Sequence, residues 1–343
     1  MKKIVFCGGG TAGHVMPNIA IIEKLKNTCE IHYIGGNGIE KEIIKKYPYV
    51  TYHEINTTKL VRKFTLKNLL IPFKLIGCVN DAKKVLKEIK PDVIFSKGGF
   101  VSVPVVLAHG KIPVYAHESD FTMGLANKLI YPHCKKMFFS FSITAEKYDK
   151  KGVYSGTPIR KDIFSGNKQQ AKEVLKIKNN LPNILVVGGS SGALAINKVI
   201  VNNLNTLTKH YNIIHITGKN KQSKISHKNY FQVDYAENMG DLLDLADIII
   251  SRAGSNAIFE FLTLNKQMIL IPLPTDQSRG DQILNARYFE KNGWAQVILQ
   301  QDLNTHTLLN AIEYSKKQKN KTKANTQLPD ATKIILNELK QYL

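Results

Sequence analysis

Twelve short apolar segments, separated by segments with helical spacing, constrain the fold of this 343-residue chain more than any other feature. Strands of a parallel sheet are continuous apolar runs, because helices cover both of its faces. Two such series in tandem predict an α/β protein with two Rossmann-like, doubly wound parallel-sheet domains. The segments are KIVFC, EIHYIG, TYHEI, PDVIFS, IPVYAH and KMFFS in the first half and NILVVGG, NIIHITG, YFQVDY, ADIIIS, QMILIP and WAQVIL in the second.

A break in this pattern marks the expected join between the domains. The stretch YSGTPIRKDIFSGNKQ places glycines and a proline in a polar run, which is typical of a connection. The stretch KKQKNKTKANTQLPD predicts a second link, after which the run from Ala331 to Leu343 recovers helical spacing that would allow it to pack on the first domain. Helices of the first half are expected to begin near Pro17, Gly38, Leu66, Ser102 and Gly124.

The chain is strongly basic, with a formal net charge of +21. Such a surface suits nucleic acid, anionic lipid or phosphorylated substrates, and it also suits a merely soluble lysine-rich protein. The net charge alone does not distinguish among these possibilities. No nucleic-acid recognition motif or aromatic platform accompanies the charge, and Trp294 is the single tryptophan, so we expect no nucleic-acid partner.

The four cysteines indicate a reducing compartment. Cys7, Cys29, Cys78 and Cys134 are far apart and form no C-x-x-C pair, which argues against a zinc site and a disulfide framework. No apolar run approaches the roughly 20 residues needed to span a bilayer, and the N-terminus enters a strand at once without a signal peptide. We therefore expect a cytoplasmic protein that is able to lie against a membrane.

Four glycine-rich turns each follow a predicted strand and precede a predicted helix. In an open parallel sheet, ligands bind at this end of the strands. Glycine lets the main chain approach a ligand closely, and the N–H groups and dipole of the following helix attract phosphate. Two turns in each domain predict a ligand cleft lined from both sides. The turns are FCGGGTAGHVMP, FSKGGFVSVP, VVGGSSGALA and ISRAGSNAIFE.

The first of these turns fits the G-x-G-x-x-G spacing of a dinucleotide site through Gly8, Gly10 and Gly13. Such a site requires an acidic residue about 20 positions later, at the end of the second strand, to hold a ribose. Here that strand ends in Ile34-Gly35-Gly36, so a nicotinamide or flavin site is not predicted. No G-K-[S/T] follows any of the four turns, which excludes a P-loop.

Seven motifs in a fixed order identify a family resemblance that covers nearly the whole chain. The motifs are GGGTAGHVMP, SKGGFVSVP, HESDFTMGLANK, SGTPIR, GGSSGA, SRAGSNAIFE and DQILNA. Together they resemble the MurG family of N-acetylglucosaminyltransferases, which convert lipid I to lipid II in peptidoglycan synthesis and so serve cell-wall growth, shape and division.

The resemblance implies a GT-B fold whose two domains face each other across a cleft. It implies a first, acceptor- and membrane-facing domain of residues 1–158 and 328–343 and a UDP-GlcNAc-binding domain of residues 159–327. It also implies an inverting transferase with UDP-GlcNAc as donor, lipid I as acceptor, and no cofactor or metal. The chain has no Asp-x-Asp pair, so a metal-clamped diphosphate of that type has no ligands. Main-chain N–H groups, helix N-termini and a cation would then stabilise the leaving UDP.

The resemblance assigns the donor-binding residues mainly to the second half of the chain. Arg160 matches the donor-binding cation, and Ser190 matches a serine that contacts the donor. Without the resemblance, Arg160 would be interpreted as a solvated linker charge and Ser190 as a helix N-cap. Glu260 matches the acid that accepts hydrogen bonds from both ribose hydroxyls. Gln282 matches a side chain facing the donor sugar, and the main chain of Ala236 aligns with the group that reads the uracil. The helix start bordering the nucleotide comprises Ser255, Asn256, Ala257, Ile258 and Phe259.

In the first half, the loop beside the transferred sugar matches Thr11, Ala12 and Gly13. His14 is the candidate general base, because a helix N-terminus disfavours imidazolium and leaves a neutral ring able to accept a proton. A structural histidine is the alternative. Glu118 is a rival base or the partner that orients His14. Asp120 stands where the family often has an asparagine that donates to GlcNAc, so it would accept from a sugar hydroxyl instead.

Residues 59–90 mix basic side chains with a crowded apolar run, LLIPF. This composition suits docking on the anionic inner leaflet of the cell membrane, and it equally suits a helix with its apolar stripe in the core. We expect a peripheral protein on the cytoplasmic face. The nearest alternative functions are a diacylglycerol-type lipid glycosyltransferase and a UDP-GlcNAc 2-epimerase of the same architecture.

Overall fold

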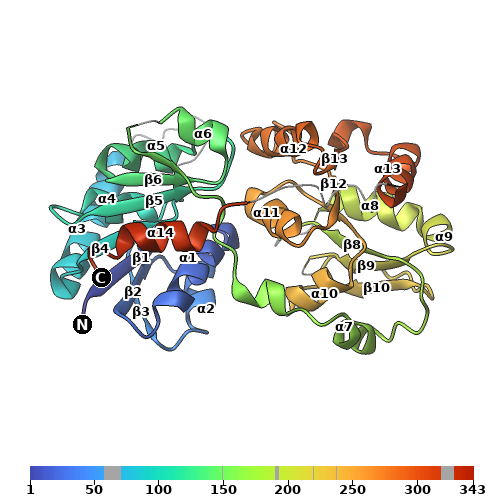
Figure 1. Cartoon of the computed structure of the whole chain (residues 1–343), viewed down its shortest axis with the longest axis horizontal. Helices are drawn as coiled ribbons and strands as arrows, with labels where there is room; N and C mark the ends of the chain where they lie inside the picture. The colour runs from blue at the N-terminus through green and yellow to red at the C-terminus, as the bar shows by residue number, and fades with distance from the viewer. Residues whose placement is uncertain (58–70, 149, 190–192, 219, 237, 318–327) are drawn as a thin grey trace. The chain divides into compact units, whose positions relative to one another are not determined.

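The computed structural model describes residues 1–57, 71–148, 150–189, 193–218, 220–236, 238–317 and 328–343. These residues form two compact units (Figure 1). Unit 1 comprises Met1–Arg160 and Pro329–Leu343, and unit 2 comprises Lys161–Leu328. Each unit contains its own parallel sheet with helices packed on it.

Unit 1 is built on a seven-stranded parallel sheet in the order β3-β2-β1-β4-β5-β6-β7. Six of its strands were predicted from the apolar segments. The seventh, β7, was missed because it has three residues and begins with a glycine, too short for a periodic signal. The strands are β1 Lys3–Cys7, β2 Glu30–Gly35, β3 Val50–Glu54, β4 Val93–Ser96, β5 Val114–Glu118, β6 Lys136–Phe139 and β7 Gly152–Tyr154.

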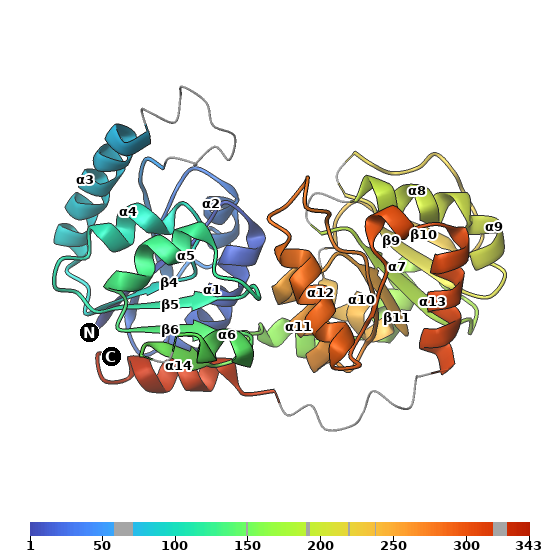
Figure 2. The same ribbon diagram turned by 90° about the horizontal axis from the view of Figure 1, so that it is seen from above.

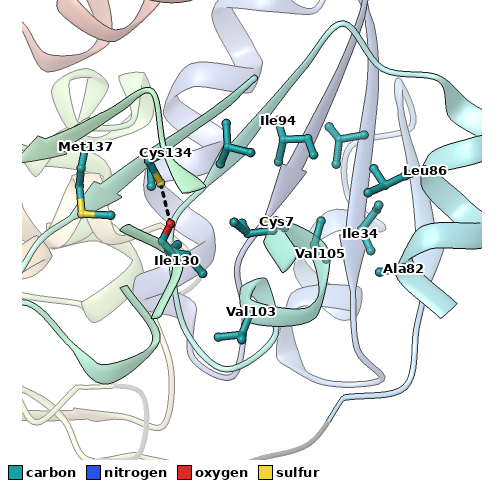
Figure 3. Packing of buried hydrophobic residues seen from close by; sticks show 14 of the residues in the cluster. Cys7, Ile34, Ala82, Leu86, Ile94, Val103, Val105, Ile130, Cys134 and Met137 are labelled. Carbon is teal, nitrogen blue, oxygen red and sulfur yellow. Dashed lines mark hydrogen bonds between the residues drawn. The ribbon is translucent and has the colours of Figure 1, made fainter. Parts of the chain in front are cut away.

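Helices cover both faces of this sheet, as the continuous apolar strands require. Alternate side chains of β1 enter different cores: Val5 and Cys7 pack with α3, α4 and α5, whereas Ile4 and Phe6 pack with α1 and α14. Figure 3 shows the first of these cores, in which Cys134 Sγ lies 3.3 Å from the carbonyl oxygen of Ile130. All four cysteines are buried thiols outside any disulfide. The helices are α1 Ala12–Leu25, α2 Ile39–Ile44, α3 Ile71–Ile89, α4 Ser102–Leu107, α5 Leu125–Ile130, the 3₁₀ turn η2 Tyr131–His133, α6 Ser142–Glu146 and α14 Ala331–Leu339.

The last helix, α14, belongs to unit 1. It lies beside α1, on the face of the sheet opposite to α3 (Figure 2). Ile335 and Leu339 are fully buried in the core that contains Ile19. Lys136 Nζ lies 2.6 Å from Glu338 Oε1, which ties the helix to the first residue of β6.

Unit 2 is built on a six-stranded parallel sheet in the order β10-β9-β8-β11-β12-β13, and all six strands were predicted. Ile184 and Ile250 pack against α8, α9 and α13, while Leu185 and Ile249 point to the other face. The elements are η3 Lys161–Ser165, α7 Lys168–Leu175, β8 Asn183–Val187, α8 Leu194–Asn202, α9 Leu204–Leu207, β9 Asn212–Ile216, β10 Tyr230–Val233, α10 Met239–Leu245, β11 Ile248–Ser251, α11 Ser255–Thr263, β12 Gln267–Leu270, α12 Asp281–Lys291, β13 Gln296–Val297, η4 Gln300–Asp302 and α13 Thr305–Lys317.

Each sheet has one topological switch point, where the strand order reverses. In unit 1 the strands on either side of it are β1 and β4, and in unit 2 they are β8 and β11. The four glycine-rich turns follow these four strands. Because ligands of open parallel sheets bind at the switch point, the topology places all four turns where a ligand is expected.

Helix α1 begins at Ala12, five residues before the start expected near Pro17. Proline is common in the first turn of a helix, which suggested the later start. Pro17 instead lies inside the helix, where it removes one main-chain hydrogen bond without ending it. The earlier start brings His14 into the first turn. The start expected near Leu66 lies outside the described residues.

Buried His215 makes the free energy of unfolding depend on pH. Burial lowers the pKa of its ring from 6.5 to about 4 in the folded chain. The folded-state pKa is depressed, so the stabilisation is present above pH 6.5 and is lost as the pH falls below that value. Because of this residue, we expect the free energy of unfolding to fall by about 2 kcal/mol as the pH is lowered from 8 to 5. Denaturant titrations at both pH values test this expectation, and an undiminished pH difference in His215→Gln would contradict it.

Candidate active site

The two glycine-rich turns of unit 1 contact each other. Gly99 has a φ of +81°, and a Cβ there would lie 2.6 Å from the carbonyl oxygen of Gly9 and 3.3 Å from His14 Nδ1. Only glycine fits this position without displacing a neighbour. The turn after β4 therefore lies directly against the turn after β1 and against the ring of His14.

His14 is the third residue of α1, and Thr11 is the N-cap. Thr11 makes no side-chain cap to a main-chain N–H group. Its Oγ1 lies instead 3.1 Å from His14 Nδ1. Thr11 is exposed, and Ala12, Gly13 and His14 are partly exposed, so this segment is accessible to a ligand.

Glu118, at the end of β5, is buried and organises the loop that follows it. Its Oε1 accepts a hydrogen bond from the N–H of Asp120 at 3.0 Å. Its Oε2 accepts from the N–H of Gly124 at 2.8 Å and from Nδ2 of Asn127 at 2.9 Å. These three hydrogen bonds hold Asp120, which is partly exposed, at the start of this loop.

Lys97 is a buried lysine between the turn after β4 and the loop after β5. Its Nζ donates to Ser119 Oγ at 2.6 Å. Burial lowers the pKa of Lys97 to about 8, while the nearby carboxylates of Glu118 and Asp120 oppose this shift. Sequence reasoning missed this residue, because a lysine in SKGG resembles any of the many surface lysines.

His117 was also missed. Its Nε2 lies 2.9 Å from the carbonyl oxygen of Gly156, and the side chain is fully buried. Burial, and then the charge of Lys97, lower the pKa of His117 well below its usual value. The neutral ring therefore connects β5 to the loop after β7.

In unit 2, the turn after β11 leads into α11, which carries the predicted residues from Ser255 to Glu260. Ser255 is buried, and Glu260 is partly exposed at the middle of the helix. Asn285 Nδ2 donates to the carbonyl oxygen of Ala253 at 3.1 Å, which ties α12 to this turn. Gln282 Oε1 accepts from the N–H of Leu273 at 3.1 Å, which fixes Gln282 against the loop after β12.

Arg252 is buried in the same turn and was not singled out from the sequence. Its Nη1 donates to the carbonyl oxygens of Ile271 and Pro272 at 2.9 and 3.2 Å. Its Nη2 donates to Gln300 Oε1 at 2.6 Å. Burial lowers its pKa. A cation directly after a buried strand, Ile248–Ser251, was the available signal, since it must find buried acceptors.

Three predicted residues lie in loops or at the boundary of a unit, or fall outside the described residues. Ala236 is partly exposed in the loop between β10 and α10, and Arg160 is the last residue of the first segment of unit 1. Ser190 lies outside the described residues. Within the described ranges, no group of three or more His, Cys, Asp or Glu side chains is arranged to hold a metal ion.

Family models match both halves of the chain. The glycosyltransferase family 28 N-terminal domain matches residues 4–139, and the glycosyltransferase family 28 C-terminal domain matches residues 183–337.

Solved structures share the fold. A structure of Acinetobacter baumannii MurG has a TM-score of 0.74 at 23% identity, covering 99% of this chain and 100% of that one. A UDP-GlcNAc 2-epimerase from Neisseria meningitidis has a TM-score of 0.65 at 16% identity, covering 99% and 100%.

Curated relatives are much more similar in sequence. Two of them carry the name UDP-N-acetylglucosamine--N-acetylmuramyl-(pentapeptide) pyrophosphoryl-undecaprenol N-acetylglucosamine transferase. The Clostridium tetani protein is 47% identical over 91% of this chain and 89% of its own length. The Clostridium perfringens SM101 protein is 48% identical over 93% and 91%. The predicted α/β fold of two parallel-sheet domains, GT-B, is confirmed, and this chain belongs to glycosyltransferase family 28, the family of the MurG N-acetylglucosamine transferases.

Proposed function

We propose that this protein is an inverting glycosyltransferase that moves GlcNAc from UDP-GlcNAc to the C4 hydroxyl of MurNAc in lipid I, giving lipid II. The observation that carries this proposal is the 47–48% identity, over more than nine-tenths of the chain, to transferases named for this reaction. The identity favours a transferase over an epimerase, because the epimerase structure shares only the fold. The product serves peptidoglycan synthesis, and through it cell shape and division.

On the acceptor side, His14 is the proposed general base. In the tautomer whose Nδ1–H donates to Thr11 Oγ1, the lone pair of Nε2 takes the proton of the acceptor hydroxyl. The hydroxyl oxygen forms a bond to the anomeric carbon from the face opposite UDP. The bond from that carbon to the UDP oxygen breaks with its electron pair, and the result is a β-1,4 linkage.

Glu118 suits the positioning of this loop better than proton transfer. Its oxygens already accept three hydrogen bonds from the segment that leads into α5. Both oxygens are thus already engaged in holding the loop. We therefore assign proton abstraction to His14 and assign to Glu118 the placement of Asp120, whose carboxylate would accept from a sugar hydroxyl.

On the donor side, unit 2 supplies the proposed contacts to the uracil and the ribose. The two oxygens of Glu260 suit both ribose hydroxyls, and the main chain of Ala236 would read the uracil. The start of α11, Ser255 to Phe259, borders the nucleotide. Because the oxygen of Gln282 is engaged by Leu273, its amide NH₂ is the group that would donate to the sugar. Arg160, Ser190 and main-chain N–H groups would stabilise the leaving diphosphate without a metal.

The proposed membrane surface comprises residues 59–90, on the cytoplasmic face and against anionic inner-leaflet lipid. Only α3 of this segment is described. One side of α3 is core, since Cys78 and Leu86 are buried, whereas Ile76 is 58% exposed and Lys74 is exposed. The buried side of α3 fits a helix packed on the core, and the exposed side leaves Ile76 and Lys74 available to a membrane surface. None of the described helices combines the length and apolar character needed to cross a bilayer.

Acceptor-dependent turnover tests the proposed reaction. Purified protein with UDP-GlcNAc should release UDP only when lipid I is added, and the product should be the disaccharide lipid. A coupled assay for UDP and mass spectrometry of the lipid measure the two products. Release of UDP without the acceptor, or formation of the 2-epimer, would contradict the proposal.

Replacement of the proposed base should separate chemistry from binding. We expect His14→Ala to lower kcat by about 10²- to 10⁴-fold, the usual contribution of general base catalysis. Its affinity for UDP, measured by calorimetry, should match the wild type, because His14 is not among the proposed nucleotide contacts. His210→Ala, which changes an exposed histidine of unit 2, is the matched control. Wild-type turnover by His14→Ala would remove His14 as the base.

Charge reversal tests the membrane surface. Lys63→Glu, Lys67→Glu and Lys74→Glu together should weaken binding to anionic vesicles, since each basic residue near such a surface contributes about 1 kcal/mol. Lys63 and Lys67 lie outside the described residues. The control reverses three exposed lysines of unit 2, Lys168, Lys178 and Lys209, with the same change of net charge. Equal vesicle sedimentation of both triple variants would contradict a specific surface at residues 59–90.

A further inference from the structure

A buried carboxylate joins two turns of unit 1. Glu40 is the second residue of α2, and only 2% of its surface is exposed. Its Oε2 accepts a hydrogen bond from the N–H of Gly10 at 3.0 Å, and its Oε1 accepts from the N–H of Gly36 at 3.1 Å. Each oxygen thus serves a different turn, one after β1 and the other after β2.

Glycines make room for this carboxylate. A Cβ on Gly9 would lie 2.6 Å from Glu40 Cδ, and a Cβ on Gly38 would lie 2.8 Å from Oε2. Real side chains do not approach so closely, so neither position accepts one while Glu40 stays where it is. The local sequence therefore supports this one placement of the carboxylate.

The N–H of Gly10 belongs to the turn that resembles a dinucleotide fingerprint. In that fingerprint, the glycine turn and the helix after it accept a phosphate. Here the anion at Gly10 is a side chain of the protein itself. A dinucleotide site would have an acidic residue at the end of β2. Here the acidic residue, Glu40, belongs to α2, and it binds the turn rather than a ribose.

We propose that Glu40 is a positioning residue for the transfer reaction: it occupies the anion-accepting N–H of Gly10 and so fixes the turn that carries Thr11 and His14. This inference rests on the proposed function. Thr11 directly follows Gly10, so a rotation of the peptide between them displaces the Thr11 hydroxyl from His14 Nδ1. The tautomer that leaves Nε2 able to accept a proton then loses its acceptor for Nδ1–H.

Glu40→Gln tests the proposal with little change in size. The amide retains one acceptor oxygen and presents an NH₂ group to one of the two N–H donors. We expect kcat, per folded molecule, to fall about 10- to 100-fold, as a displacement of about 1 Å near the reacting groups does. The affinity for UDP, which lacks the transferred sugar, should stay within about twofold, because the proposed uracil and ribose contacts lie in unit 2.

Glu42→Gln is the matched control. Glu42 lies on the same helix, is exposed, and pairs with Lys45 on the surface. Its kcat should equal that of the wild type. A folded Glu40→Gln variant with the same kcat as Glu42→Gln would overturn the proposal.

Gly38→Ala provides a second variant, used also if Glu40→Gln does not fold. Gly38 has an extended φ of −123°, which alanine adopts without strain, and its new Cβ would push Oε2 away from Gly10. We expect the same loss of kcat with an unchanged affinity for UDP. Unchanged turnover by Gly38→Ala would contradict the proposal.

Hydrogen exchange separates this proposal from the proposed function. The amide of Gly10, followed by mass spectrometry of a peptide covering residues 6–12, should exchange slowly in the wild type and faster in Glu40→Gln. This readout requires no turnover. If the wild type lacked acceptor-dependent turnover, the proposed function would fail, and exchange alone would decide whether Glu40 anchors the turn. Equal exchange in both folded proteins would overturn the anchor.

Discussion

The switch point of a parallel sheet imposes the constraint on which this structure depends. Two neighbouring strands send the chain to opposite faces there, so the turns that follow them leave the sheet's hydrogen bonding and need other polar partners. Unit 1 meets this need after β1 with the carboxylate of Glu40, which accepts from the N–H of Gly10, and Glu118 accepts in the same way from the loop after the neighbouring strand β5. Unit 2 meets it after β11 with Asn285, which donates to the carbonyl oxygen of Ala253, and with Arg252, which joins this turn to the carbonyl oxygens after β12.

This difference agrees with the proposed division of substrates between the units. An internal carboxylate at the glycine turn of unit 1 makes that turn unfavourable for a second anion, and a sugar hydroxyl is a better ligand there. In unit 2, the N-cap of α11 is Gly254, which has no side chain to cap the helix. Such a helix N-terminus favours an anion, which is the character of a nucleotide diphosphate.

The sequence predicted the sheets well because their strands are buried on both faces and therefore continuously apolar. It predicted the four turns because glycine is required where main-chain segments approach closely, as Gly99 approaches Gly9. It did not predict β7, whose three residues carry no periodic signal. It also missed Glu40 and Lys97, because a charged residue in a short polar segment resembles a surface residue until the fold brings the neighbouring turns around it.

The buried charged groups around the glycine turns of unit 1 also explain why we expect the loss of one to affect kcat more than substrate binding. Glu40, Glu118 and Lys97 are buried, and each one has a hydrogen-bond partner within the protein. Their desolvation and ordering are therefore completed during folding, and a substrate meets groups that are already oriented. An unpartnered charge here would reorganise when the substrate binds, and that reorganisation would add to the barrier of the chemical step. In the proposed mechanism, preorganisation by buried polar contacts would thus link the glycine turns, through His14, to the rate of transfer.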